Sequence, residues 1–140
     1  MEEASGWFGK YEIVIGEERF KINNRITNAA LSVVRDAWYG DVVNLQIKYL
    51  ALGTGSLAVN DEDTALGIEQ FRTEFIDREK KAHNQSQTTA IVLDNEAVFY
   101  IKEVGVFTAD NIMISRILWD RDKTNLESVQ FIRTDTINRG

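Results

Sequence analysis

Apolar and polar residues alternate with a period of two over much of the chain, a pattern typical of β-strands. Residues 10–15 alternate up to Gly16, and the alternation resumes over 19–22. We therefore expect residues 1–23 to form an N-terminal hairpin or arm. The chain contains no proline, so its turns must be made by glycine, asparagine and aspartate.

Two segments depart from this period and predict helices. Over 27–39, apolar residues recur at helical spacing, Thr27 or Asn28 can cap the first turn, and Gly40 can end the helix. A second short helix is expected over 61–70, because the acidic residues in its first turn suit the positive end of the helix dipole.

Strands fill the rest of the predicted fold. Residues 43–52 are apolar on both faces, so this strand should be covered on both sides. It should end in the glycine-rich turn 53–56, where we expect positive φ. From Phe71 onward the pattern predicts strands joined by polar turns. The expected strands cover 71–75, 89–93, 98–101, 104–107, 113–119 and 129–137, with turns around His83, at 110–111 and over 120–123.

These elements predict one mainly β domain over residues 1–140. Short strands at close spacing favour an antiparallel β-sandwich or a barrel-like domain, with one or two short helices at about 27–39 and 61–70. A chain of this length can bury a sizeable core without a disulfide or a metal to hold it together.

Composition limits both the chemistry and the partners. The absence of cysteine excludes a disulfide framework, a thiolate metal site and a cysteine nucleophile. The net charge is −6 without a basic block, and no apolar run approaches the ~20 residues of a membrane span. We therefore expect neither nucleic acid nor a membrane as a partner. The single histidine, His83, lies in a polar run and is expected in a solvated turn.

Three local patterns resemble functional motifs without meeting their requirements. The turn 53–56 lacks the lysine of a phosphate-binding loop. A calcium loop starting at Asp61 would place Ala65 and Arg72 where oxygen ligands are needed. Residues 120–124 fit the DxDx[TV] pattern of phosphatases with an aspartate nucleophile, but a single predicted strand follows instead of an α/β sheet. We expect no catalytic, cofactor-binding or metal-binding residue.

Several short motifs follow one another along the chain. An apolar strand ends in Gly-Thr-Gly at 53–55, Asp-Thr-Ala-Leu stands at 63–66, and Glu-Val-Gly-Val-Phe at 103–107. In their order and spacing, with further segments at 6–8, 26–31 and 115–119, they resemble small structural proteins of tailed bacteriophages, often described as tail-fibre or tail proteins.

The resemblance implies a virion protein that is not an enzyme and needs no cofactor. It implies self-assembly, with a trimer expected by analogy, and docking onto other phage structural proteins as a tail, baseplate or fibre-attachment component. Large aromatic residues are the candidates for such interfaces. For Trp38 we favour burial in the core, and for Trp7 and Phe8 both roles stay open. The candidate interface residues are Trp7, Phe8, Trp38, Tyr39 and Trp119.

Two alternatives remain open. One is a capsid decoration protein that stabilises the head lattice, and the sequence does not decide between head and tail. The other is a carbohydrate-binding module for host recognition, with Trp119 beside Asp120 and Arg121 as its sugar platform. An enzyme that acts through Asp120 is the least favoured reading.

Overall fold

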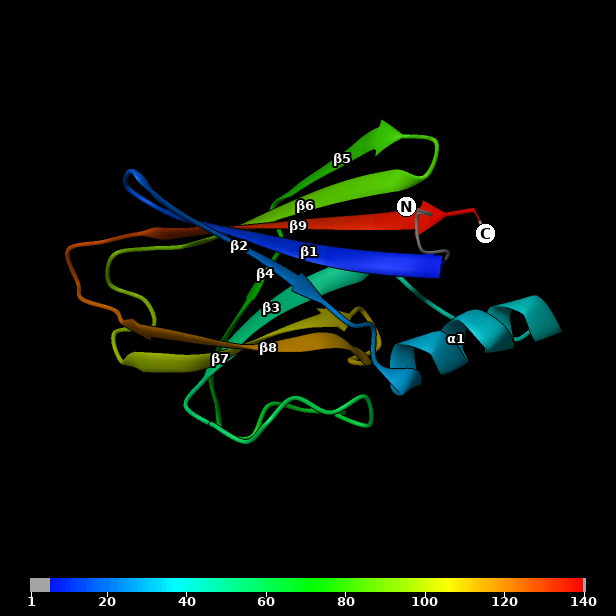
Figure 1. Ribbon diagram of the computed structural model, residues 1–140, viewed down its shortest axis with the longest axis horizontal. Coiled ribbons are helices and arrows are strands. Elements are labelled where there is room, and N and C mark those ends of the chain that lie inside the picture. Colours follow the sequence, from blue (N-terminus) through cyan, green and yellow to red (C-terminus); the bar gives the residue numbers. More distant parts are fainter. Residues whose placement is uncertain (1–5, 140) are drawn as a thin grey trace, which may run out of the picture.

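A computed structural model describes residues 6–139, which fold into nine strands and one helix (Figure 1). The elements are β1 (Gly6–Ile15), β2 (Glu18–Asn24), α1 (Asn28–Tyr39), β3 (Ile47–Gly53), β4 (Glu69–Glu74), β5 (Asp77–Ala82), β6 (Gln85–Val92), β7 (Tyr100–Thr108), β8 (Met113–Asp122) and β9 (Val129–Asn138). The mainly β prediction is confirmed. The architecture is a sandwich of two antiparallel sheets and not a closed barrel.

The strands divide into a five-stranded sheet A, in the order β2-β1-β9-β6-β5, and a four-stranded sheet B, in the order β4-β3-β7-β8. β1 and β2 form a hairpin whose turn contains Gly16 at a φ of 57°. β1 also pairs with β9 over most of its length, so this hairpin is an integral part of sheet A. Residues 1–5 of the predicted N-terminal segment lie outside the described residues.

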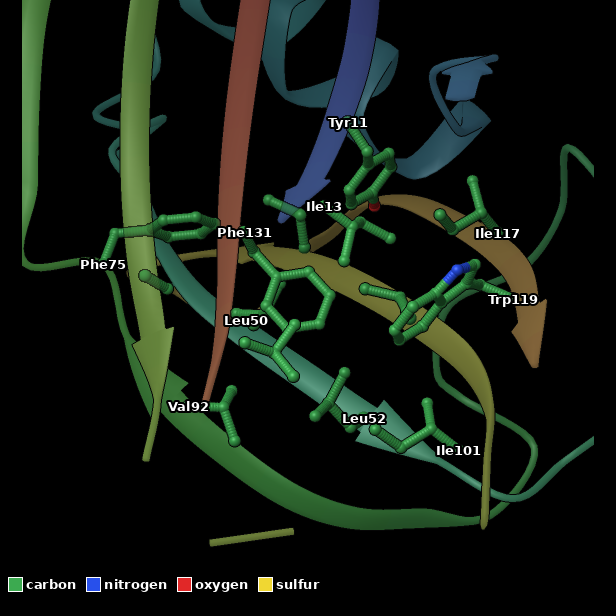
Figure 2. Packing of buried hydrophobic residues seen from close by; sticks show 14 of the residues in the cluster. Tyr11, Ile13, Leu50, Leu52, Phe75, Val92, Ile101, Ile117, Trp119 and Phe131 are labelled. Carbon is green, nitrogen blue, oxygen red and sulfur yellow. The ribbon is translucent and has the colours of Figure 1, made fainter. Parts of the chain in front are cut away.

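The main core lies between the sheets and is built from the inward-facing residues of both (Figure 2). Alternate residues of β1, including Tyr11 and Ile13, point inward as the period of two requires. Trp119 of β8 packs edge-to-face against Phe20 and Phe131, with ring centroids 5.7 and 5.9 Å apart. The core therefore provides a rigid base for α1 and the loops.

β3 is covered on both sides, as its apolar pattern predicts. Leu50 and Leu52 face the main core, whereas Ala51 lies in a second cluster on the outer face of sheet B. The loop between β3 and β4 runs along this outer face (Figure 1) and contributes Leu66 to the cluster. The members of the second cluster are Ala51, Leu66, Phe107 and Met113.

α1 begins and ends at the predicted residues. The Thr27 hydroxyl accepts a hydrogen bond from the Ala30 amide at 3.1 Å, and Gly40 ends the helix in the left-handed conformation. The same hydroxyl donates to the Met113 carbonyl at 2.5 Å, which ties the start of α1 to β8. Ala30 is the one buried residue of the helix, and α1 extends away from both sheets (Figure 1).

Replacing Thr27 with alanine is expected to lower the free energy of unfolding by about 1–2 kcal/mol, because the N-cap and the bond to β8 are both lost. Urea denaturation followed by circular dichroism measures this change. Thr124→Ala is a matched control, because Thr124 bonds only locally in an exposed turn. A Thr27→Ala variant as stable as that control would contradict the capping role.

The second helix predicted over 61–70 is wrong. Residues 61–68 form an irregular loop that leads into β4. Side chains here bond to the backbone locally: Asp63 accepts from the Asn60 amide, and Asn60 accepts from the Glu62 amide, each at 2.9 Å. Such local bonds compete with helix formation.

Two further differences concern strands. β5 carries no alternation to reveal it, because all of its residues are exposed at the edge of sheet A. The segments 98–101 and 104–107, predicted as separate strands, belong largely to one strand, β7. The pairing of β7 with β8 shifts register between Ile101 and Glu103, which interrupts the pattern in the sequence.

Candidate functional site

A fully buried carboxylate, Glu103 of β7, lies at the centre of a polar cluster on the outer face of sheet B. Its Oε2 accepts hydrogen bonds from the amides of Gly55 at 2.6 Å and Ile68 at 2.9 Å. Its Oε1 accepts from the Gly67 amide and from Arg116 Nε, both at 2.8 Å. Glu103 therefore fixes both ends of the loop between β3 and β4.

Arg116 of β8 extends this cluster along the loop. Its Nη2 donates to the Leu57 carbonyl at 2.8 Å, and its Nη1 lies 3.4 Å from the Asp63 carboxylate. Gly55 is required for space: a Cβ there would lie 2.4 Å from Glu103 Oε2. The positive φ predicted for this turn is wrong, since neither of its glycines adopts it.

The carboxylate of Glu103 remains ionised. Burial alone would raise the pKa of Glu103, but the hydrogen bonds from the Ile68 amide, from Arg116 and from two glycine amides outweigh this effect and lower it. A carboxylate that is fully enclosed and fully bonded presents no face to a substrate. The cluster therefore has a structural role, which is to hold the loop between β3 and β4 against sheet B.

A second buried cluster lies between the sheets around Arg133 of β9. Arg133 Nη2 donates to the Asp135 carboxylate at 2.9 Å, and Nη1 donates to the Asn24 side chain at 2.6 Å and the Ser115 hydroxyl at 2.9 Å. The guanidinium also lies 4.9 Å from the centre of the Tyr11 ring. Burial alone would lower the pKa of Arg133, but the Asp135 carboxylate contributes to raising it, so Arg133 stays charged.

The end of α1 exposes large apolar side chains. Trp38 is 83% exposed, Tyr39 is 88% exposed, and Val42 just beyond the helix is fully exposed. We refer to Trp38, Tyr39 and Val42 as the α1 tip. Leu31, two turns before Trp38 on the same helical face, is also exposed. Contiguous apolar surface of this kind marks interaction sites in soluble proteins.

Beside Val34 of α1, the inner face of sheet A is hollowed. Two adjoining hollows of about 350 and 440 Å³ share Leu45, Ile47, Lys80 and Ser86 in their walls, and we call them together the groove. On the sheet side, its residues continue the inward-facing rows of β1, β6 and β9; on the other side it is bounded by α1 and the segment before β3. The apolar walls are formed by Trp7, Val34, Leu45, Ile47 and Ile137.

One polar atom in the wall of the groove has no partner among the described residues. Thr88 of β6 is 3% exposed and lines the smaller hollow, and its hydroxyl makes no hydrogen bond. Buried hydroxyls are nearly always bonded, because leaving one unpaired costs about 1–3 kcal/mol. The Thr88 hydroxyl is itself buried behind this wall, so it is an unsatisfied polar atom beside the groove and not an open binding position.

The predicted interface aromatics have different surroundings. Trp38, expected in the core, is exposed, so that expectation is wrong; Tyr39 lies beside it in the α1 tip. Trp7 is partly buried, donates to Asp135 at 2.8 Å and lines the groove. Phe8, the next residue of β1, points to the opposite face. Trp119 is only 7% exposed, so it offers neither an interface nor a sugar platform.

The structure of residues 120–124, the segment that fits the phosphatase pattern, also differs from the prediction. The turn predicted over 120–123 is wrong, because β8 continues to Asp122 and the turn lies at 125–126. Lys123, expected to be solvated, is buried and donates to the carbonyls of Leu93 and Asp94 at 3.0 Å. Burial lowers the pKa of Lys123. His83 lies in an exposed turn between β5 and β6, as predicted.

Sequence reasoning did not identify the groove, because its walls come from distant parts of the chain. The alternation through Leu45 and Ile47 was a signal, but it did not show that these residues border an uncovered part of the inner face of sheet A. Within residues 6–139, no three His, Asp or Glu side chains gather as a metal site. In the same part of the chain, no helix is long and apolar enough to cross a membrane.

Comparison of the chain with protein-family models, with curated proteins and with solved structures finds no match.

Proposed function

We propose that this chain is a non-enzymatic structural protein of a tailed-bacteriophage virion. It assembles with copies of itself and docks onto neighbouring virion proteins as a tail, baseplate or fibre-attachment component. The observation that carries self-assembly is the α1 tip, where Trp38 and Tyr39 are almost fully exposed on a helix that extends from the sandwich (Figure 1).

The area of the α1 tip supports this proposal. An aromatic side chain buries about 150–250 Å² when it is covered. Two such rings would supply roughly half of the ~800 Å² that each partner contributes to a standard interface. An isolated helix as short as α1 is marginal in water, so a partner that covers the tip would also stabilise the helix.

The phage context is supported by the order of the motifs. Gly-Thr-Gly at 53–55, the loop through 63–67, Glu103 of β7 and Arg116 of β8 meet in the cluster around Glu103. The shared pattern is therefore what fixes the loop on sheet B, as expected for a rigid building block whose function lies in its surfaces.

Light scattering of the purified protein tests self-assembly. The wild type is expected to form an oligomer. The double variant Trp38→Ala/Tyr39→Ala is expected to associate at least about 30-fold more weakly, because each aromatic anchor contributes about 2 kcal/mol or more. Leu126→Ala is the control, since Leu126 is equally exposed in the turn at the opposite end of the molecule (Figure 1). A monomeric wild type, or a double variant with unchanged mass, would contradict the proposal.

Co-sedimentation with empty phage heads and with isolated tails tests the virion assignment. Binding to tails at low copy number supports the attachment role. Binding to heads at high copy number supports the decoration alternative and rejects the attachment role. A protein that sediments with neither particle is not the virion component that we propose.

A further inference from the structure

We propose that the groove of one copy receives the α1 tip of a second copy. This inference rests on the proposed self-assembly and specifies the joint between subunits. The groove has room for an occupant, because the inner face of sheet A is left uncovered there.

The chemistry of the groove selects its occupant. Its walls combine the apolar side chains of Val34, Leu45 and Ile137 with the polar side chains of Gln85 and Ser86. A side chain that combines an apolar body with one polar atom meets both requirements, and tryptophan and tyrosine are such residues. The α1 tip presents one of each, Trp38 and Tyr39.

The charges around the two surfaces are complementary. Lys80 at the rim of the groove is exposed and forms no ion pair with any residue of the described range. Asp41 follows the α1 tip directly, is also exposed, and forms no ion pair within 6–139 either. If the α1 tip of one copy occupied the groove of another, Asp41 of the first copy would come close to Lys80 of the second and could form an ion pair with it.

Residues 6–139 of the same chain leave the tip uncovered. Val34 of α1 already forms one wall of the groove, and Trp38, one turn later, remains 83% exposed. The match must therefore form between copies. Since every copy carries one tip and one groove, the same joint repeats, either reciprocally in a dimer or around a closed ring.

Complementation between two variants tests this joint. Trp38→Ala/Tyr39→Ala removes the tip but keeps the groove, whereas Ser86→Trp fills the groove but keeps the tip. Each variant alone is expected to be monomeric by light scattering. Their equimolar mixture is expected to form a one-to-one complex, because one intact tip and one intact groove remain.

The outcomes separate this inference from the proposed function. If folded Ser86→Trp assembles like the wild type while the tip variant does not, the groove is not the acceptor, although self-assembly through the tip stands. If the wild type itself is monomeric, the proposed self-assembly and this joint are both wrong. A mixture that stays monomeric, while the wild type assembles, also rejects the joint.

Discussion

Replacing Glu103 with glutamine is expected to lower the free energy of unfolding by about 3–5 kcal/mol, a large share of the ~5–15 kcal/mol of a typical domain. The change leaves the buried Arg116 without its closest carboxylate, at 2.8 Å. It also turns an amide NH₂ group toward donors that need an acceptor. Urea denaturation at pH 7 measures the loss.

The same variant should change how stability depends on pH. The pKa of Glu103 is lowered in the folded state, so its contribution is complete above the unfolded pKa of about 4.3 and is lost as pH falls through the folded pKa. The difference between wild type and Glu103→Gln should therefore shrink in acid. Glu74→Gln, an exposed control, should stay within about 0.5 kcal/mol of wild type. A Glu103→Gln variant as stable as this control would contradict the stabilising role of Glu103 in holding the loop between β3 and β4.

Local signals were sufficient where the determinants lie close together in the sequence. Thr27 and Gly40 bound α1 because capping involves residues within one turn of the helix. The hairpin of β1 and β2 turns at Gly16 for a similar reason. These elements and the sandwich class could be predicted from the sequence.

Long-range contacts explain why the second helix could not be predicted. The acidic start of 61–70 favours a helix by itself, but the Gly67 and Ile68 amides bond to Glu103, which lies 36 and 35 residues away. No pattern within residues 61–70 shows that Glu103 competes with a helix for these amides. The motif containing Glu103 was recognisable, but the partner of its side chain was not.

The candidate site was predictable only in part. Size and residue type identified Trp38, Tyr39 and Trp119 as possible anchors, yet exposure depends on what packs against each side chain. Trp119 belongs to a strand that sheet A covers, whereas Trp38 lies at the end of α1 that extends beyond the sheets and is 83% exposed. Nothing in the sequence shows that the buried hydroxyl of Thr88 lacks a hydrogen-bond partner within residues 6–139, because this depends on which side chains surround it in the fold.

Replacing Arg133 with methionine should destabilise the protein by about 3–5 kcal/mol, although methionine keeps much of the apolar stem. Asp135 would then keep a buried charge whose one remaining side-chain hydrogen bond among residues 6–139 comes from the Trp7 indole at 2.8 Å. The exposed Arg35–Asp36 pair provides the control, and Arg35→Met should cost less than about 1 kcal/mol.

The double variant Arg133→Met/Asp135→Asn shows whether the loss of stability comes from the broken ion pair or from the lost packing of the Arg133 stem. Because it removes both charges, its cost should be smaller than the sum of the two single variants, with a coupling of about 1–3 kcal/mol measured by urea denaturation. Additive costs would mean that the two side chains act independently, and that packing of the Arg133 stem accounts for its effect. Strong coupling would mean that the buried ion pair stabilises this end of the sandwich. Trp7 and Asp135 line the groove at the same end.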